Sequence, residues 1–581
     1  MSTNNDLNAI RHSLAHLLGA AILELYPGAK LAIGPAIDDG FYYDVDVVGK
    51  ISDVDLPAIE NKMREILKTW DKFEKIEETE DSSKSRYLDN QYKNELIQEL
   101  VNKGVEITSY KSGGFTDLCR GGHVESAKKI QANSFKLSRI AGAYWRGNEK
   151  NPQLTRIYGF AFTSKKELDE HLKMLEEAKK RDHKKLGIEL DLFTFSDLVG
   201  SGLPLWTPKG TLLRNILDDF VWELRRKAGY QQVDIPHITK KELYEKSGHW
   251  EKFKDELFQI KTREGHLFAM KPMNCPHHTQ IYARKPHSYR ELPQRYANTT
   301  KVYRDEQSGE LAGLSRVRSI TQDDAHVFCR YSQAGEEMGK IWDIITSFYE
   351  AIGFKLHVRL SLHDPAHQEN YLGDNDTWEK AENQLRQVVK NKKAQTEDEA
   401  VGEAAFYGPK IDFSGQDSLG RHWQLATIQL DMNMPERFDL VCLNEKGEKE
   451  RIVMVHAAIM GSIERFLSVI IEHFSGAFPL WLSPVQVAIL PITDKQNEWA
   501  EEVLKQLKDS GIRAELNSEN ETLGKKIRQA ELQKTPYLLV VGDKEVQATT
   551  VAVRQRGKGD IGQMELDKLV DKLQKEISDK I

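Results

Sequence analysis

The chain has 581 residues, too many for one hydrophobic core, which predicts roughly three or four domains. Its hydrophobic content of 39% indicates a folded soluble protein. Its formal net charge of −7 argues against attraction of the whole molecule to nucleic acid, so any RNA contact must use local basic patches. The scattered cysteines form no CxxC pair, no apolar run reaches the ~18 residues of a membrane span, and the chain starts with no signal peptide, so we expect a cytoplasmic protein without a membrane partner.

The first segment, up to about residue 163, is expected to mix helices with strands. An apolar helix is predicted over residues 14–25 and a short strand over residues 40–46. His12 and His16 lie four residues apart, on one face of a helix. With Cys119 and His123 they make a plausible zinc tetrad by ligand type, although such imidazoles could equally position a water next to an ester.

The next segment predicts a helix between domains. Ser164-Lys-Lys-Glu167 is typical of a capping box, and apolar residues then recur at helical spacing from Leu168 to Ala178. We expect one long solvated helix over residues 164–187. Its lysine-rich end is interpreted as a solvent-exposed helix surface, and an RNA contact is the alternative.

Residues 316–328 are the most informative part of the chain. In a strand, alternate side chains share a face, so one face would carry Arg316, Arg318, Ile320, Gln322, Asp324 and His326. A half-buried strand would alternate apolar with polar residues, and this one does not. We therefore expect a composite ligand on this face rather than an exposed edge strand.

The residues before this ribbon favour phosphate binding. Arg304 is followed by the turn-prone stretch 307–310 and then by Arg316, a spacing typical of a hairpin. Guanidinium groups bind phosphate oxygens bidentately, which suits a polyphosphate. The alternative phosphate site, a GxxxxGK[ST] loop, does not occur in this chain.

The rest of the chain predicts two further folds. Residues 188–480 mix long helices with strands, as expected of an antiparallel sheet flanked by helices. From residue 485, strands at 485–492, 513–516, 537–542 and 550–554 alternate with helices at 498–508 and 523–532, before a closing helix from about residue 564. This alternation predicts a small α/β domain.

Several motifs resemble a known family. Arg304 with Glu306 resembles motif 2 of the class II aminoacyl-tRNA synthetases, Arg465 in Gly461-Ser-Ile-Glu-Arg-Phe resembles motif 3, and Pro236 resembles the motif 1 proline. Four further strings are similar to threonyl-tRNA synthetases specifically: residues 271–276 (KPMNCP), 321–326 (TQDDAH), 406–410 (FYGPK) and 455–456 (VH).

The resemblance implies an α+β multidomain protein with a class II antiparallel sheet core. Its expected parts are an α+β editing domain (1–163), a linker helix (164–187), the catalytic domain (188–483) and an α/β anticodon-binding domain (484–581). Family members commonly carry a ubiquitin-like domain before the editing domain; this chain starts at the latter, and activity is expected to survive. Motif 1 implies a homodimer.

The implied reaction is ATP-dependent attachment of L-threonine to tRNA(Thr) through a threonyl-adenylate, with ATP and Mg²⁺ as substrate. By resemblance Arg304 contacts the α-phosphate, Arg465 the γ-phosphate and Arg316 a further phosphate, while Asp324 pairs with the threonine amine. Other substrate-side positions match Glu306, Gln322, Tyr407, Lys410, Thr427 and Gln429. Two alternatives are a stand-alone metallohydrolase and a non-catalytic tRNA-binding paralogue.

The resemblance also implies one Zn²⁺ per subunit, held by Cys275, His326 and His456. Taken singly, each would be read as a buried cysteine or a satisfied histidine. Three protein ligands leave a tetrahedral zinc open for the amine and hydroxyl of threonine, which would reject valine because it lacks the hydroxyl.

Serine lacks only a methyl group, worth about 1–3 kcal/mol of rejection, so a second sieve is expected. By resemblance that sieve hydrolyses seryl-tRNA(Thr) without a required metal. Its residues would be His12, His16, Cys119, His123, Tyr43, Lys93 and Asp117. Gly122 stands where the family usually has a proline.

Anticodon contacts are implied for Asn520, Arg528, Lys534, Glu545 and Arg554. Lys534 replaces the usual arginine and loses its planar fork, which suggests a phosphate contact. Near motif 2, Gln307, Ala312 and Ile320 depart from the family pattern. Ile320 stands where an aromatic residue stacks on adenine and offers no π face, so stacking there is expected to be weaker.

Overall fold

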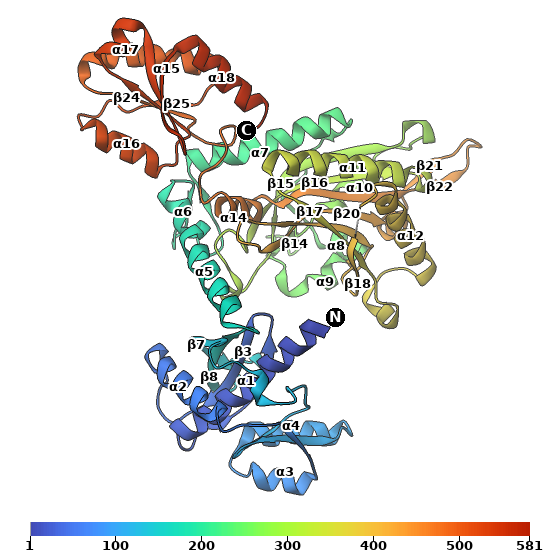
Figure 1. Cartoon of the computed structure of the whole chain (residues 1–581). Coiled ribbons are helices and arrows are strands. Elements are labelled where there is room, and N and C mark those ends of the chain that lie inside the picture. Colours follow the sequence, from blue (N-terminus) through green and yellow to red (C-terminus); the bar gives the residue numbers. More distant parts are fainter. Residues whose placement is uncertain (1, 395) are drawn as a thin grey trace. The chain divides into compact units, whose positions relative to one another are not determined.

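The computed structural model describes residues 2–394 and 396–581 and divides the chain into two compact units, Met1–Glu177 and Ala178–Ile581 (Figure 1). Among the described residues, no helix is both long enough and apolar enough to cross a membrane.

The first unit is an α+β fold with two antiparallel sheets. The larger has the order β1-β3-β8-β7, with β2 paired to β3; its strands are β1 (Lys30–Leu31), β2 (Ala36–Ile37), β3 (Gly40–Asp46), β7 (Phe135–Tyr144) and β8 (Gln153–Ala161). The smaller sheet consists of β4 (Glu74–Glu78), β5 (Ile107–Ser112) and β6 (Phe115–Leu118). The predicted strand at 40–46 is confirmed.

Helix α1 (Ser2–Leu25) is the central helix of this unit and packs against β3 and α2 (Leu56–Leu67). Its residues from Leu14 to Ile22 are buried around the whole helix, as expected of a helix enclosed by other elements. Two further helices, α3 (Glu80–Arg86) and α4 (Gln91–Asn102), complete the unit. The predicted apolar helix is confirmed, and it begins earlier than residue 14.

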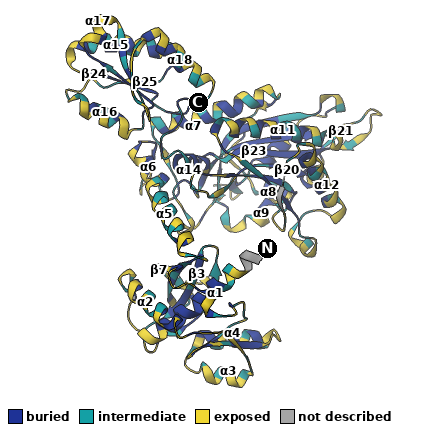
Figure 2. Cartoon of the chain, in the orientation of Figure 1, coloured by how far each residue is buried: buried dark blue, intermediate teal, exposed yellow. Residues whose placement is uncertain are grey.

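The expectation of one linker helix over 164–187 is wrong. The structure has α5 (Lys165–Arg181), which is largely exposed, and a separate helix α6 (His183–Glu189) (Figure 2). Asp182 interrupts them because its carboxylate accepts the Lys184 N–H at 2.8 Å and caps a new helix. At the start of α5, Ser164 accepts the Glu167 N–H as predicted, but the Glu167 carboxylate accepts the N–H of Thr163 rather than that of Ser164.

The second unit contains an eight-stranded sheet in the order β11-β15-β16-β23-β20-β19-β17-β18. Its inner pairs are antiparallel, as predicted, and only the edge pairs β11/β15 and β17/β18 are parallel. The strands are β11 (Gln231–Gln232), β15 (Gln294–Tyr303), β16 (Ser319–Cys329), β17 (Leu356–Leu362), β18 (Thr396–Val401), β19 (Lys410–Gln416), β20 (His422–Asp431) and β23 (Val453–Ser462).

The two faces of this sheet have different roles. One face, including Ala325 and Val327, packs against α7 (Pro208–Lys227), α11 (Tyr331–Ile352), α12 (Asn375–Asn391) and α14 (Ile463–His473). Strand alternation then places Asp324, His326 and Phe328 on the opposite face, where α10 (Cys275–Ala283) packs. Apart from α10, these helices thus leave the opposite face to polar side chains such as Asp324 and His326.

Three smaller sheets are peripheral to this one. The first consists of β12 (Ile238–Lys240), β14 (Leu267–Met270) and β13 (Gln259–Lys261), and the other two are the pairs β9 (Phe193–Thr194) with β10 (Leu205–Trp206) and β21 (Val441–Leu443) with β22 (Lys449–Arg451). The short helices are α8 (Lys241–Ser247), α9 (His249–Lys252) and α13 (Asn433–Arg437).

The last segment of the second unit is the predicted α/β fold. Its sheet has the order β25-β24-β26-β27-β28, with the first three strands parallel; they are β24 (Val487–Pro491), β25 (Ala514–Leu516), β26 (Tyr537–Val541), β27 (Thr550–Gln555) and β28 (Gly559–Glu565). Helices α15 (Asn497–Asp509) and α18 (Leu566–Ser578) cover one face, and α16 (Leu523–Leu532) covers the other. The prediction omitted β28 and the short helix α17 (Asp543–Ala548).

Candidate active sites

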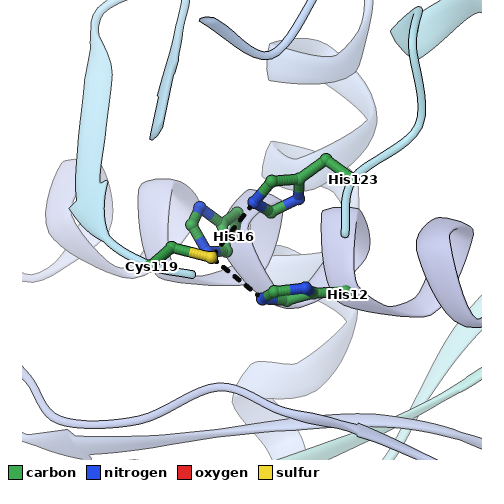
Figure 3. Close-up of side chains that lie close together, drawn as sticks. All are labelled: His12, His16, Cys119 and His123. Carbon is green, nitrogen blue, oxygen red and sulfur yellow. Dashed lines mark hydrogen bonds between the residues drawn. The ribbon is translucent and has the colours of Figure 1, made fainter. Parts of the chain in front are cut away.

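The histidine and cysteine residues of the first unit come together as the spacing predicted. His12 and His16 project from α1, and Cys119 and His123 follow β6 (Figure 3). Cys119 Sγ lies 3.4 Å from His12 Nε2 and 3.3 Å from His123 Nε2, and one ligand atom from each of the four residues lies within 4.8 Å of the others.

Burial sets the charge of this cluster. Desolvation lowers the pKa of His12, lowers that of His16 further, and lowers that of His123 to about 2, while it raises the pKa of Cys119 to about 11. At physiological pH the imidazoles and the thiol are therefore neutral. Neutral imidazoles can accept a proton from water, whereas a protonated thiol is a weak nucleophile.

A buried ion pair lies next to the cluster. Lys93 Nζ lies 2.6 Å from Asp117 Oδ1, and the Tyr43 hydroxyl, 3.3 Å from Lys93 Nζ, donates to the other Asp117 oxygen. All three side chains are buried. Because each charge is paired and hydrogen-bonded, this trio can hold a fixed field inside the protein.

A cavity of about 440 Å³ opens over these groups, and its size suits a small ligand. His12, His16, Lys93, Asp117 and Cys119 line it together with apolar residues such as Ile33 and Leu96, whereas Tyr43 and His123 stand behind the lining. The loop that carries His123 passes through Gly122 at φ +88°, which a proline cannot adopt.

The second unit holds a larger cavity, of about 720 Å³, on the open face of the eight-stranded sheet. Every substrate-side residue expected from the sequence lines it: Arg304, Glu306, Arg316, Gln322, Asp324, Tyr407, Lys410, Thr427, Gln429 and Arg465, together with Ile320 and His456. Strand register explains the grouping, because His326, His456, Gln429 and Lys410 are direct partners in a row across β16, β23, β20 and β19.

The predicted ribbon is shorter than expected. Strand β16 begins at Ser319, because the Arg318 N–H bonds to Gly202 O and Arg316 pairs back with Ala312. Arg316 still lines the cavity from this turn, but Arg318 does not: its Nε donates to Glu306 O. The prediction that Arg318 shares the ligand-binding face is wrong.

The three arginines that line the cavity differ in their partners. Arg316 is neutralised by Glu306, at 2.6 Å, and by Glu310, at 3.4 Å. Arg304 lies over the Phe253 ring, has Met273 Sδ at 3.7 Å, and its buried Nε has no hydrogen-bond partner. Within the described part of the chain, neither Arg304 nor Arg465 has a carboxylate within ion-pair distance. Two unneutralised guanidinium groups that face one cavity form a site for an anion.

Cys275, His326 and His456 meet next to this cavity, although they come from remote segments. His326 Nε2 lies 3.1 Å from His456 Nδ1, all three ligand atoms lie within 4.8 Å of one another, and all three residues are buried. Burial raises the pKa of the Cys275 thiol and lowers that of His326.

Residues that sequence reasoning missed orient these groups. The Asp431 carboxylate lies 3.0 Å from His456 Nε2, and His278 Nδ1 lies 2.8 Å from His326 Nδ1. Asn274 donates to Asp324 at 3.0 Å. Asp431 could have been found, because it follows Gln429 by two residues and so shares its strand face. His278 has no such signal.

The proposed anticodon positions gather on one face of the C-terminal sheet. Arg554 lies opposite Leu538, on the face that α16 covers, and Arg528 is exposed on α16 itself. Asn520 and Lys534 flank that helix. Glu545 differs from these, because its buried carboxylate already accepts from Gly542 N–H at 3.0 Å and from Gln563 at 2.5 Å.

Comparison with family models defines the class of protein. Residues 258–474 match the tRNA synthetase class II core domain (G, H, P, S and T), residues 486–576 match the anticodon binding domain, and residues 107–158 match the threonyl and alanyl tRNA synthetase second additional domain. The fold and its domains are those of a class II aminoacyl-tRNA synthetase.

Relatives narrow the class to one family. The chain is 50% identical to the threonine–tRNA ligase of Porphyromonas gingivalis, over 99% of this chain and 88% of that protein, and 49% identical to that of Acetivibrio thermocellus, over 99% and 89%. It also matches the crystal structure of the RNA binding domain of threonyl-tRNA synthetase from Cryptosporidium parvum, with a TM-score of 0.65 and 36% identity over 68% of this chain and 98% of that chain. The chain belongs to the threonine–tRNA ligase family.

The family, the fold class and the enzyme class that were predicted from the sequence are therefore confirmed. Ligation of threonine to tRNA, with editing, is the function that this family membership supports, and neither the stand-alone metallohydrolase nor the non-catalytic paralogue is favoured.

Proposed function

We propose that the cavity of the second unit forms threonyl-adenylate and passes the threonyl group to tRNA(Thr). The carboxylate of threonine attacks the α-phosphorus of ATP and pyrophosphate leaves; a terminal ribose hydroxyl of the tRNA then attacks the threonyl carbonyl and AMP leaves. Neither step needs a protein nucleophile, so the chain's contribution is positioning and charge stabilisation.

The observation that carries this proposal is the pair of unneutralised guanidiniums, Arg304 and Arg465, in one cavity with Asp324. We assign Arg304 to the α-phosphate, Arg465 to the γ-phosphate and Arg316 to a further phosphate contact, with Mg²⁺ entering on ATP. Asp324, oriented by Asn274, accepts a hydrogen bond from the threonine amine. Threonine-dependent exchange of pyrophosphate into ATP tests the proposal directly, and serine or valine in place of threonine measures selectivity.

We propose that Cys275, His326 and His456 hold one zinc ion per subunit. The donor set fits, because one thiol and two imidazoles are typical zinc ligands and Asp431 holds the His456 ring through its far nitrogen. When bound, zinc with three protein ligands supplies open coordination positions for the amine and hydroxyl of threonine. Gln429 and Lys410, next in the same row of the sheet, would fix the other end of the substrate.

An aromatic residue at position 320 tests the adenine contact. Ile320 is half-buried and lines the cavity, where it can pack against a base but cannot stack. We expect Ile320→Phe to lower the KM for ATP by about two- to tenfold, since a stacked pair contributes roughly 0.5–1.5 kcal/mol, with the KM for threonine unchanged. An unchanged ATP KM in this variant would show that residue 320 does not contact the base.

We propose that the cavity of the first unit hydrolyses seryl-tRNA(Thr). The neutral imidazole of His12 accepts a proton from the attacking water, and Lys93, fixed by Asp117 and Tyr43, holds the ester or its ribose. The 440 Å³ volume leaves room for an aminoacyl ester.

Replacing His12 by alanine separates the two sites. We expect clearance of preformed seryl-tRNA(Thr) to fall about 100-fold, because general base catalysis contributes at least that much, while threonine activation stays at the wild-type rate. The matched control is His171→Ala, which removes a histidine of α5 that does not line the cavity. Wild-type clearance by His12→Ala would remove His12 from the mechanism.

We further propose anticodon binding by the C-terminal face that carries Asn520, Arg528 and Arg554, with Lys534 on a phosphate; the filled hydrogen bonds of Glu545 suit a positioning role. A homodimer through the segment of Pro236 is supported by an exposed apolar side chain there, Ile238 at 48%. We keep the domain boundaries at 163/164, 187/188 and 483/484 and a cytoplasmic location as parts of this proposal. Sedimentation of the purified chain measures the assembly.

A further inference from the structure

His183 lies outside both cavities, yet both nitrogens of its ring are engaged. It is the first residue of α6 and only 5% exposed. Its Nδ1 lies 2.7 Å from Glu472 Oε1, and its Nε2 lies 3.1 Å from the backbone nitrogen of Leu314. A backbone N–H can only donate, so His183 Nε2 accepts the Leu314 N–H. The ring proton is therefore on Nδ1, which donates a hydrogen bond to the Glu472 carboxylate.

The cluster of Asp182, His183 and Glu472 has the composition of a metal site, but the ring nitrogens of His183 and the carboxylate of Glu472 are already hydrogen-bonded within the protein. A metal ion on His183 would need a ring nitrogen that is now used, and Glu472 also accepts from Arg421 Nη2 at 2.5 Å and from the His183 N–H at 3.2 Å. The arrangement is therefore a hydrogen-bonded chain that runs from Arg421 through Glu472 and His183 to Leu314.

The chain of bonds ends on the turn Ala312–Arg316. Leu314 is fully buried in the core of the second unit, and Ser315 Oγ lies 3.0 Å from Ser468 Oγ on α14. Gly313, at φ +53°, lies against the His183 ring so closely that a Cβ there would stand 2.3 Å from Nε2. No side chain can be placed between the ring and the turn.

This turn forms one wall of the ATP cavity proposed above. Ser315, Arg316 and Val317 all line the cavity. The hydrogen bond of the Leu314 N–H thus holds the residue directly before those that would contact the nucleotide. Its acceptor, His183, lies on a helix more than a hundred residues earlier in the chain.

We propose that His183 is a positioning residue for the adenylation reaction: by accepting the Leu314 N–H it holds the turn Ala312–Arg316, and with it Arg316, in place for ATP. The inference rests on the proposed ATP site. It predicts a defect in ATP use that leaves the threonine pocket, built from β16, β20 and β23, unchanged.

Two substitutions of His183 test its two side-chain hydrogen bonds separately. In His183→Asn the amide nitrogen stands near the position of Nδ1 and keeps the bond to Glu472, but nothing reaches Leu314. In His183→Gln the amide oxygen reaches the position of Nε2 and can accept the Leu314 N–H. In pyrophosphate exchange we expect His183→Asn to raise the KM for ATP by about five- to tenfold with the KM for threonine within about twofold of wild type, and His183→Gln to restore most of the ATP KM.

A purely structural role would instead raise both KM values alike, in step with the loss of thermal midpoint. That result, or a His183→Gln variant no better than His183→Asn, would overturn the proposal. Should His183→Asn not fold, Gly313→Ala takes its place, because its methyl group pushes the turn away from the ring; a wild-type ATP KM in that variant would equally overturn it. Absence of threonine-dependent exchange in the unaltered protein would instead refute the proposed function, so the two failures are distinguishable.

Discussion

Cys275→Ala is expected to abolish zinc binding and to reduce threonine-dependent pyrophosphate exchange by about 10³-fold. The thiol is one of the three proposed ligands, and the imidazoles of His326 and His456 alone would bind zinc much more weakly. Without the metal the substrate amine and hydroxyl lose their partner, so discrimination between threonine and valine should disappear in the residual activity. Metal analysis of the purified variant and exchange assays with both amino acids measure the two effects.

The matched control for this variant is Cys442→Ala. Cys442 is also buried, on β21 (Val441–Leu443), and belongs to the same apolar cluster as Cys275, but its thiol is not one of the three grouped ligand atoms. It should cost stability through a small cavity and leave zinc content and exchange intact. Full zinc occupancy and normal exchange in Cys275→Ala would contradict the assignment of this residue as a ligand.

Arg304→Ala is expected to reduce kcat/KM for ATP by about 10²- to 10³-fold, with the KM for threonine little changed. A guanidinium that meets charge developing on phosphate contributes roughly 3–4 kcal/mol to the transition state. Among the described residues no carboxylate lies within ion-pair distance of this group; Arg304 lies over the Phe253 ring, has Met273 Sδ at 3.7 Å, and its Nε has no hydrogen-bond partner. Its charge is therefore available to a ligand, and removing it leaves no buried carboxylate unpaired.

Two other arginines serve as comparators. Arg316→Ala should cost less, about tenfold, because Glu306 and Glu310 already offset its charge. Arg263→Ala, in the exposed turn between β13 and β14, should change nothing. Equal losses in all three variants would indicate a general effect of lost positive charge rather than a phosphate contact, and a loss confined to the threonine KM would move Arg304 to the amino-acid pocket.

The positions of individual helices and strands were largely predictable, because the signals act over a few residues. Strand alternation and helical spacing located β3, α16 and the β15–β16 hairpin. Prediction failed where a bond to a distant residue overrode the local pattern. The turn at Ala312–Arg316 is pinned by Leu314 to His183, and Arg318 bonds to Gly202, so the ribbon starts at Ser319 rather than at Arg316.

By itself the sequence determined which chemical groups this protein has and which local elements carry them: two histidines on one helix face, arginines on both sides of a hairpin turn, and polar residues alternating along strands. Only the tertiary structure decided which groups meet. His326 reaches His456 because β16 and β23 pair in one register, and a slip of β16 by one residue would turn His326 to the opposite face. The pairing of β23 with β20 and of β20 with β19 places Gln429 and Lys410 beside them, and packing leaves Arg304 and Arg465 without a carboxylate partner among the residues that the structure describes. The meeting of His326 with His456 depends on a contact between residues 130 positions apart, which no local pattern encodes.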